Sequence, residues 1–271
     1  MMTLDIRSLC VKWFGFIMGL FAFPCIALSA PSFDSITFKP ATDQGFYLTT
    51  EQSQTLGQWN YAAGLLAEFS NDSVIARTVN RIRVNDVVNE ELTLHASGAL
   101  GLFDWLNAGV LVEFVPLQHF NAIGTNVADD GARMGDIRFN LKGRILDNEK
   151  HPVGISIVPF VTFPTGDDEH FTGNGKVTGG GMLVIDTPRI HDKFSASLNV
   201  GGQVREAVTL APGTTINDQF LVGAGVNYAV HPKVELIAEV NGWTPFESFW
   251  EDNVRNLEAN GAVRWSFADG W

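Results

Sequence analysis

The chain has 271 residues, of which 45% are hydrophobic and 18% are charged, and its formal net charge is −12. The charged fraction is below that of an average soluble domain. The excess of acidic residues argues against a nucleic-acid partner, because phosphate binding requires Lys and Arg in excess. This length allows one large all-β domain or two small ones.

Residues 1–30 are predicted to be a cleaved signal peptide. Two basic residues precede an uncharged apolar run over residues 13–28, and small residues follow that run around Ala30. The alternative is an uncleaved membrane anchor. The run is short for a spanning helix and contains Pro24, which favours the signal peptide.

The placement of the cysteines agrees with export. Cys10 and Cys25 both fall inside the predicted leader, so the mature chain would carry no thiol. That suits passage through an oxidising periplasm, where a stray thiol forms wrong disulfides. It also excludes a Cys nucleophile and a thiolate metal site in the mature chain.

From Trp59 onward, apolar residues recur at every second position, which is the period of a β-strand and not of a helix. The clearest run is residues 137–145, where Ile, Phe and Leu alternate with Arg, Asn and Lys. About ten such runs follow one another, each near the length of a tilted transmembrane strand. Residues 57–271 are therefore predicted to form an outer-membrane β-barrel, preceded by a periplasmic N-terminal segment over residues 31–56.

The connections between the predicted strands alternate in length. Short turns fall at residues 103–105, 147–151, 187–193 and 231–232. Longer connections fall at residues 70–90, 117–135, 164–175, 206–218 and 244–256. Outer-membrane barrels have tight periplasmic turns and long surface loops, so the alternation predicts that the first strand runs outward from the periplasm.

The predicted fold is all-β, an antiparallel transmembrane up-and-down β-barrel of about ten strands. Its apolar face would meet lipid, with Val110, Leu141 and Ile157 near mid-membrane, and its polar face would line the lumen. The alternative is a soluble sheet with an aromatic core. That alternative leaves the leader and the alternating connections unexplained.

Five stretches resemble the N-terminal barrel region of OmpA-like outer-membrane proteins. They are FKPATDQGFYLTTE (38–51), GALGLFDWLNAGV (98–110), MGDIRFNLKGRI (134–145), FPTGDDEHFTG (163–173) and NGAVRWSF (260–267). The resemblance implies a barrel in the outer membrane and no particular reaction. In that family the strands usually continue, so the barrel either closes at ten strands or belongs to a twelve-stranded one. Nothing follows Trp271, so the peptidoglycan binding of the family's C-terminal domain is not carried over.

Ten ionisable residues are predicted to line the lumen, because they alternate with the apolar rows: Glu91, His95, Glu113, Asp136, Arg138, Lys142, Arg144, Glu235, Glu239 and Arg264. One interpretation is a set of cross-strand ion pairs that fills a narrow barrel. The other is an ion-selective lining of a water-filled pore.

No pattern for a metal, a cofactor or a catalytic centre stands out in the sequence. The acidic clusters at 129–130 and 167–169 lack the spacing of a calcium loop, and the histidines are scattered. Neither a phosphate loop nor a serine-hydrolase motif is present. We therefore expect no cofactor and no enzyme activity.

Two functions are compatible with these patterns. The first is a passive outer-membrane pore or transporter for small solutes or ions. The alternative is a structural barrel with a filled lumen and interactions at its surface loops. In either case the expected partner is outer-membrane lipid.

Overall fold

The computed structural model describes residues 33–43, 45–77, 83–120, 130–211, 214–251 and 255–266. The predicted leader over residues 1–30 lies outside these ranges. Within them, no helix is long and apolar enough to cross a membrane. The one helical element there is a single 3-10 turn at Asp168–His170.

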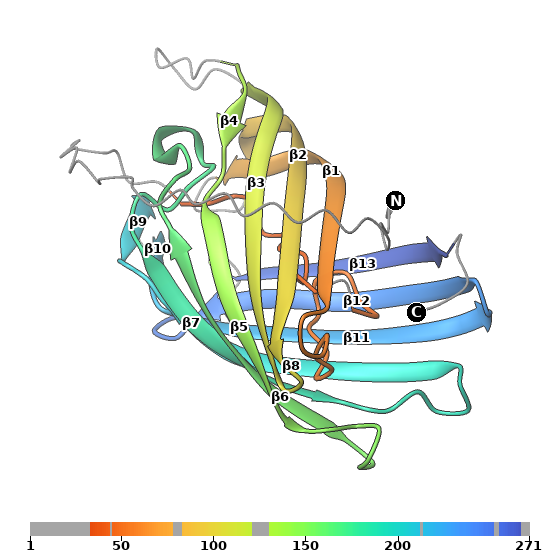
Figure 1. Cartoon of the computed structure of the whole chain (residues 1–271). Helices are drawn as coiled ribbons and strands as arrows, with labels where there is room; N and C mark the ends of the chain where they lie inside the picture. The colour runs from red at the N-terminus through yellow and green to blue at the C-terminus, as the bar shows by residue number, and fades with distance from the viewer. Residues whose placement is uncertain are drawn as a thin grey trace, which may run out of the picture.

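Ten antiparallel strands lie side by side in chain order and form one strongly curled sheet (Figure 1). They are β1 (Tyr61–Arg77), β2 (Arg83–Phe103), β3 (Leu106–Phe120), β5 (Ile137–Leu146), β6 (Gly154–Phe163), β7 (Thr178–Asp186), β8 (Phe194–Val204), β11 (Gln219–His231), β12 (Val234–Pro245) and β13 (Asn256–Trp265). The two-residue β4 (Arg133–Met134) pairs with β3, and β9 (Val208–Ala211) forms a separate hairpin with β10 (Thr214–Ile216). The predicted all-β, antiparallel, up-and-down arrangement is confirmed.

The curled sheet is a half-barrel whose two edges are β1 and β13. Among the described residues no pairing joins these two strands. Ten strands therefore do not close into a ring here. Right-handed strand twist and the uniform antiparallel order produce the curl, which gives the sheet a concave and a convex face.

Each face of the sheet carries the residues that the alternation of apolar and polar positions in the sequence predicted for it. On β3, Asn107, Leu111 and Glu113 are buried on the concave face, whereas Val110 and Phe114 point to the convex face. Successive strand side chains point to opposite faces, so the same alternation runs through β5, β6 and β11. Most concave positions are polar, with apolar exceptions such as Leu111 on β3.

Burial in this sheet is the reverse of that in a soluble protein. Among the described residues, buried polar and charged side chains outnumber buried apolar ones. Large apolar side chains are exposed instead, among them Leu141 at 44% and Ile157 at 48%. Water-soluble domains rarely expose apolar surface on this scale.

The predicted long connection at residues 70–90 is wrong, because strand pairing continues through most of it. Ser70 pairs with Glu91, and the ladder extends, with irregularities, as far as Arg77 and Arg83. This part of the hairpin is rich in polar residues on both faces, so its sequence lacks the alternation of apolar and polar residues that predicts a strand. The predicted short turn between β2 and β3 is confirmed, with two residues between the strands.

Candidate functional site on the concave face

The concave face of the sheet is occupied by residues 33–43 and 45–56. Residues 33–56 are here called the N-terminal segment. From the sequence, residues 31–56 are predicted to precede the barrel strands and to form no part of them. In the structure their described part contacts the inner side of β3, β5, β7, β8, β11 and β12 through hydrogen bonds and ion pairs. The interior of the half-barrel is thus filled by the chain itself.

Glycines on the concave face let the N-terminal segment approach the strands closely. A Cβ atom on Gly109 of β3 would lie 2.2 Å from the Thr42 hydroxyl oxygen. A Cβ atom on Gly225 of β11 would lie 2.8 Å from a ring carbon of Tyr47. Any larger residue would displace the segment, because real Cβ atoms do not approach other atoms so closely.

Lys142 of β5 makes the central ion pair of the site. Its ammonium lies 2.5 Å from Asp43 and 2.6 Å from Glu51, and the three side chains are between 1% and 8% exposed. A buried ammonium requires anionic partners, since an unpaired charge is very costly away from water. Both partners come from the N-terminal segment. The ion pairs of Lys142 are therefore not pairs between neighbouring strands, as one interpretation of the sequence had them.

Glu239 of β12 captures the backbone of the N-terminal segment. Its carboxylate accepts hydrogen bonds from the amides of Leu48 at 2.7 Å and Thr49 at 3.1 Å, and from the Thr49 hydroxyl at 3.0 Å. Hydrogen bonds to an ionised acceptor are stronger than neutral ones. Glu239 therefore fixes the segment against the C-terminal strands.

A third anchor is formed at the end of β7, in the middle of β8 and at the start of β6. Asp186 accepts hydrogen bonds from the Ser53 amide at 2.6 Å and the Ser53 hydroxyl at 2.7 Å. The side-chain oxygen of Asn199 accepts a hydrogen bond from the Glu51 amide at 2.7 Å, and its side-chain nitrogen donates one to the Glu51 carbonyl at 3.0 Å. Gly154 leaves the space for Ser53, whose hydroxyl oxygen would lie 2.0 Å from an added Cβ atom.

A fourth group surrounds Glu113 of β3. Lys39 lies 2.5 Å from Glu113 and 2.8 Å from Asp34, so it links the N-terminal segment to the sheet. The two ring nitrogens of His95 lie 3.2 Å from Glu113 and 3.0 Å from Glu68. Two of the predicted site residues, His95 and Glu113, therefore belong to one network.

Burial and pairing shift the pKa values of the two segment residues in this group. Burial raises the pKa of the Asp34 carboxyl to about 6, although Lys39 opposes the shift. Burial lowers the pKa of the Lys39 ammonium, but the charges of Asp34 and Glu113 outweigh it and raise this pKa above its ordinary value. Lys39 thus stays charged at neutral pH and can hold Glu113.

Two further predicted residues bind other parts of the chain instead of the N-terminal segment. Asp136 accepts hydrogen bonds from the amides of Gly166 and Asn174, both at 2.9 Å. Glu91 accepts a hydrogen bond from Gln118 at 2.8 Å. Asp136 thus holds the connection between β6 and β7 against the sheet, whereas Glu91 binds its cross-strand partner on β3, which also donates to the His170 carbonyl of that connection.

The remaining paired residues sit near the short turns. Glu235 lies 2.5 Å from Arg189 and 3.5 Å from Arg264. Arg144 donates to Gln54 of the N-terminal segment at 3.0 Å. Of the ten predicted residues only Arg138 has no hydrogen bond or ion pair of its side chain among the described residues, and it stacks on an aromatic ring instead.

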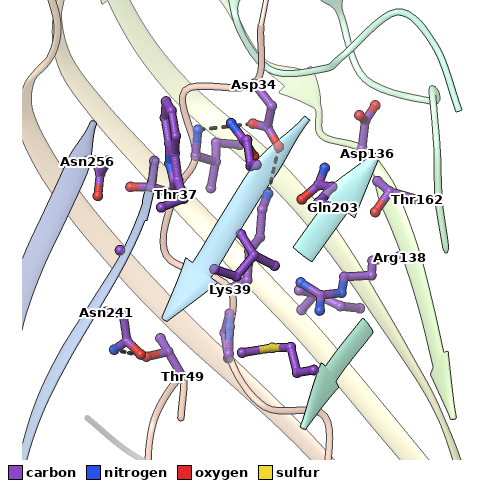
Figure 2. A pocket seen from close by; sticks show the side chains of 18 of the residues that line it. Asp34, Thr37, Lys39, Thr49, Asp136, Arg138, Thr162, Gln203, Asn241 and Asn256 are labelled. Carbon is purple, nitrogen blue, oxygen red and sulfur yellow. Dashed lines mark hydrogen bonds and ion pairs between the residues drawn. The ribbon is translucent and has the colours of Figure 1, made fainter. Parts of the chain in front are cut away.

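A cavity of about 170 Å³ remains between the N-terminal segment and the sheet. Figure 2 shows its lining: side chains of β5, β6 and β8 on one side, and those of β12 and β13 on the other. Asp34 and Lys39 of the segment reach into it. Charges of both signs therefore face the same cavity.

Sequence reasoning did not find the residues of the N-terminal segment that complete the site, namely Lys39, Asp43 and Glu51. They lie outside the alternating runs, so no period marked their direction. The signal in the sequence is a mismatch of charge. Lys142 has no carboxylate opposite it on either neighbouring strand, since its β3 partner is Asn107 and β6 contains no acidic residue.

Within the described ranges, no group of three or more His, Cys, Asp or Glu residues is arranged to hold a metal ion. No protein-family model matches the chain, and no curated protein does. The geometry itself therefore has to indicate what the site does, and it anchors a segment inside a curled sheet.

Replacing Gly225 by Ala should loosen the N-terminal segment. The added methyl group would overlap the Tyr47 ring and should lower the free energy of unfolding by about 1–3 kcal/mol, as overpacking does. Faster hydrogen exchange at residues 45–50 should accompany the loss. Gly261→Ala is the matched control, because a Cβ atom there, on the exposed convex face, comes no closer than 3.9 Å to another atom, an ordinary van der Waals distance. Equal effects of the two changes would contradict the seating of Tyr47.

Replacing Lys142 by Met should leave Asp43 and Glu51 buried without a counter-charge. We expect the free energy of unfolding in urea to fall by roughly 3–5 kcal/mol, the usual effect of removing one partner of a buried pair. Adding Asp43→Asn and Glu51→Gln to the same variant should restore most of the loss. If the triple variant is no more stable than Lys142→Met, the three residues do not form one charge cluster.

Proposed function

We propose that this chain is an integral outer-membrane β-barrel protein whose interior is closed by its own N-terminal segment. The observation that carries the proposal is the inverted burial, with charged residues inside the curl and large apolar side chains on its convex face. Transmembrane barrels have this arrangement, because the outer surface meets hydrocarbon while the polar groups face inward.

The network on the concave face favours a structural barrel with a filled lumen. The N-terminal segment is held by the buried Lys142 cluster, by Glu239 and by Asp186. Removing the N-terminal segment would leave the charged side chains of Lys142, Glu239 and Asp186 without these partners. Of the two functions expected from the sequence, the structural barrel therefore fits this geometry better.

A passive pore for small solutes is the second candidate, and the cavity favours it. The cavity lies on the inner side of the sheet and carries ionisable groups of both signs. Solute passage would require the N-terminal segment to move, since it fills the rest of the described interior. The segment would then act as the gate of the pore.

The membrane proposal sets a requirement on the two edge strands. Backbone amides and carbonyls cannot remain unpaired in hydrocarbon, so β1 and β13 must gain hydrogen-bonding partners in the membrane. The predicted signal peptide would supply the export route. The longer connections, such as those at residues 117–135 and 244–256, would then face the cell surface.

Substituting Arg on the convex face tests the membrane location. Val110→Arg, Leu141→Arg and Ile157→Arg should each lower the free energy of unfolding in lipid vesicles by about 2–4 kcal/mol, because the charge would sit near the bilayer midplane. Ile145→Arg, near the end of β5, is the matched control and should cost only about 0–1 kcal/mol. A loss that does not depend on depth would argue against a bilayer around this face.

Single-channel recording tests the closed interior. The full chain should show little or no conductance in planar bilayers, whereas a chain lacking residues 33–56 should form open channels, because the material that fills the concave face is gone. The shifted gel mobility of the unheated barrel would show that the shortened chain still folds. Equal conductance of both chains would mean that the segment does not close the interior.

A further inference from the structure

Two arginines that line the cavity lack the carboxylate partners that other buried cations of this site have. The guanidinium of Arg138 lies 3.8 Å from the ring centre of Phe160. The Nε atom of Arg205 is buried and has no hydrogen-bond partner. No carboxylate of the described residues is within ion-pair distance of either, and acidic groups act on them only at longer range. Both therefore have donors free for another group.

The pairing register of the strands places the two arginines at the same height along the strand direction. Arg138 on β5 pairs with Thr162 on β6, and Thr162 pairs with Thr178 on β7. Arg205 directly follows the β8 residue that pairs with Gly179, so it stands level with Thr178. Three strand spacings separate the two backbones by roughly 14 Å. The curl of the sheet turns both side chains into the same cavity.

The cavity also holds an acceptor without a partner. The amide nitrogen of Asn174 donates to Asp136 at 3.0 Å, and this hydrogen bond fixes the orientation of the side chain. The Asn174 Oδ1 atom is then buried without a donor. Buried polar atoms normally have partners, so unpaired donors and an unpaired acceptor around one space indicate a bound polar molecule.

The charges of the cavity limit the chemistry of that molecule. The carboxylates of Asp34, Glu113 and Asp136 line the same space and already accept hydrogen bonds. A second negative charge on a ligand would be repelled by them, whereas an ammonium group would be attracted. Arginine binds a carboxylate with a planar pair of donors.

We propose that this cavity binds a small zwitterion of the amino-acid type. Arg138 and Arg205 hold its carboxylate, and Asn174 Oδ1 accepts a hydrogen bond from its ammonium group. The volume of about 170 Å³ suits a molecule of that size. The inference goes beyond the proposed function, because a filled structural barrel requires no ligand.

The test is a titration of the purified full chain in detergent micelles with L-alanine and with propionate. The two probes have the same carbon skeleton, and propionate lacks the ammonium group. L-alanine should give a saturable rise in Tm and saturable heat in calorimetry, and propionate should bind at least tenfold more weakly. Arg138→Gln and Arg205→Gln should each weaken L-alanine binding by about 10- to 100-fold, the effect of losing a charged hydrogen bond.

Arg264→Gln is the matched control, because Arg264 is already paired with Glu235. It should leave L-alanine binding unchanged. The Tm without ligand shows that each variant is folded. No saturable binding to the unaltered chain, or unchanged affinity in both Arg138→Gln and Arg205→Gln, would overturn the site. Equal affinity for propionate would overturn the zwitterion assignment. Binding in micelles needs neither a bilayer nor conductance, so this result is independent of the tests of the proposed function.

Discussion

The neutralisation of Lys142 is the interaction on which the rest of the concave face depends. Its alternation with apolar neighbours on β5 directs its ammonium into the curl, where water is largely excluded. The neighbouring strands offer no carboxylate at that level, so Asp43 and Glu51 must reach it from outside the sheet. One buried cation thus explains why a segment without strand pairing lies inside the half-barrel.

The other contacts follow from this placement and give the interior its shape. Where the N-terminal segment comes closest, the strands carry glycine, as at Gly109 and Gly225. Where the backbone of the segment passes a strand, a carboxylate such as that of Glu239 accepts hydrogen bonds from the backbone amides of the segment. Beyond these contacts a cavity remains, and its charged lining is the part of the interior that is open to another molecule. The convex face, with its apolar side chains, is what a lipid bilayer requires.

The sequence predicted the strands and their two faces, because both depend on local alternation. The order of the strands and the inward position of residues such as Arg138 and Glu239 follow from the same pattern. The extension of the β1–β2 hairpin was missed, since polar residues on both faces leave no period. The roles of Asp43 and Glu51 were missed for a different reason: their contacts are long-range, and no local rule determines which strand an irregular segment meets.

The seating of the N-terminal segment is tested most directly by a disulfide between Ser53→Cys and Asp186→Cys. The side-chain oxygens of Ser53 and Asp186 lie 2.7 Å apart, so thiols at these two positions would face each other. Oxidation of the folded double variant should cross-link nearly all of the protein, seen as a shift in gel mobility that reductant reverses. Pairing Ser53→Cys with Gly143→Cys, whose side chain would point to the convex face, should give no cross-link. If the cysteines at positions 53 and 186 fail to cross-link in folded protein, the N-terminal segment does not lie inside the sheet.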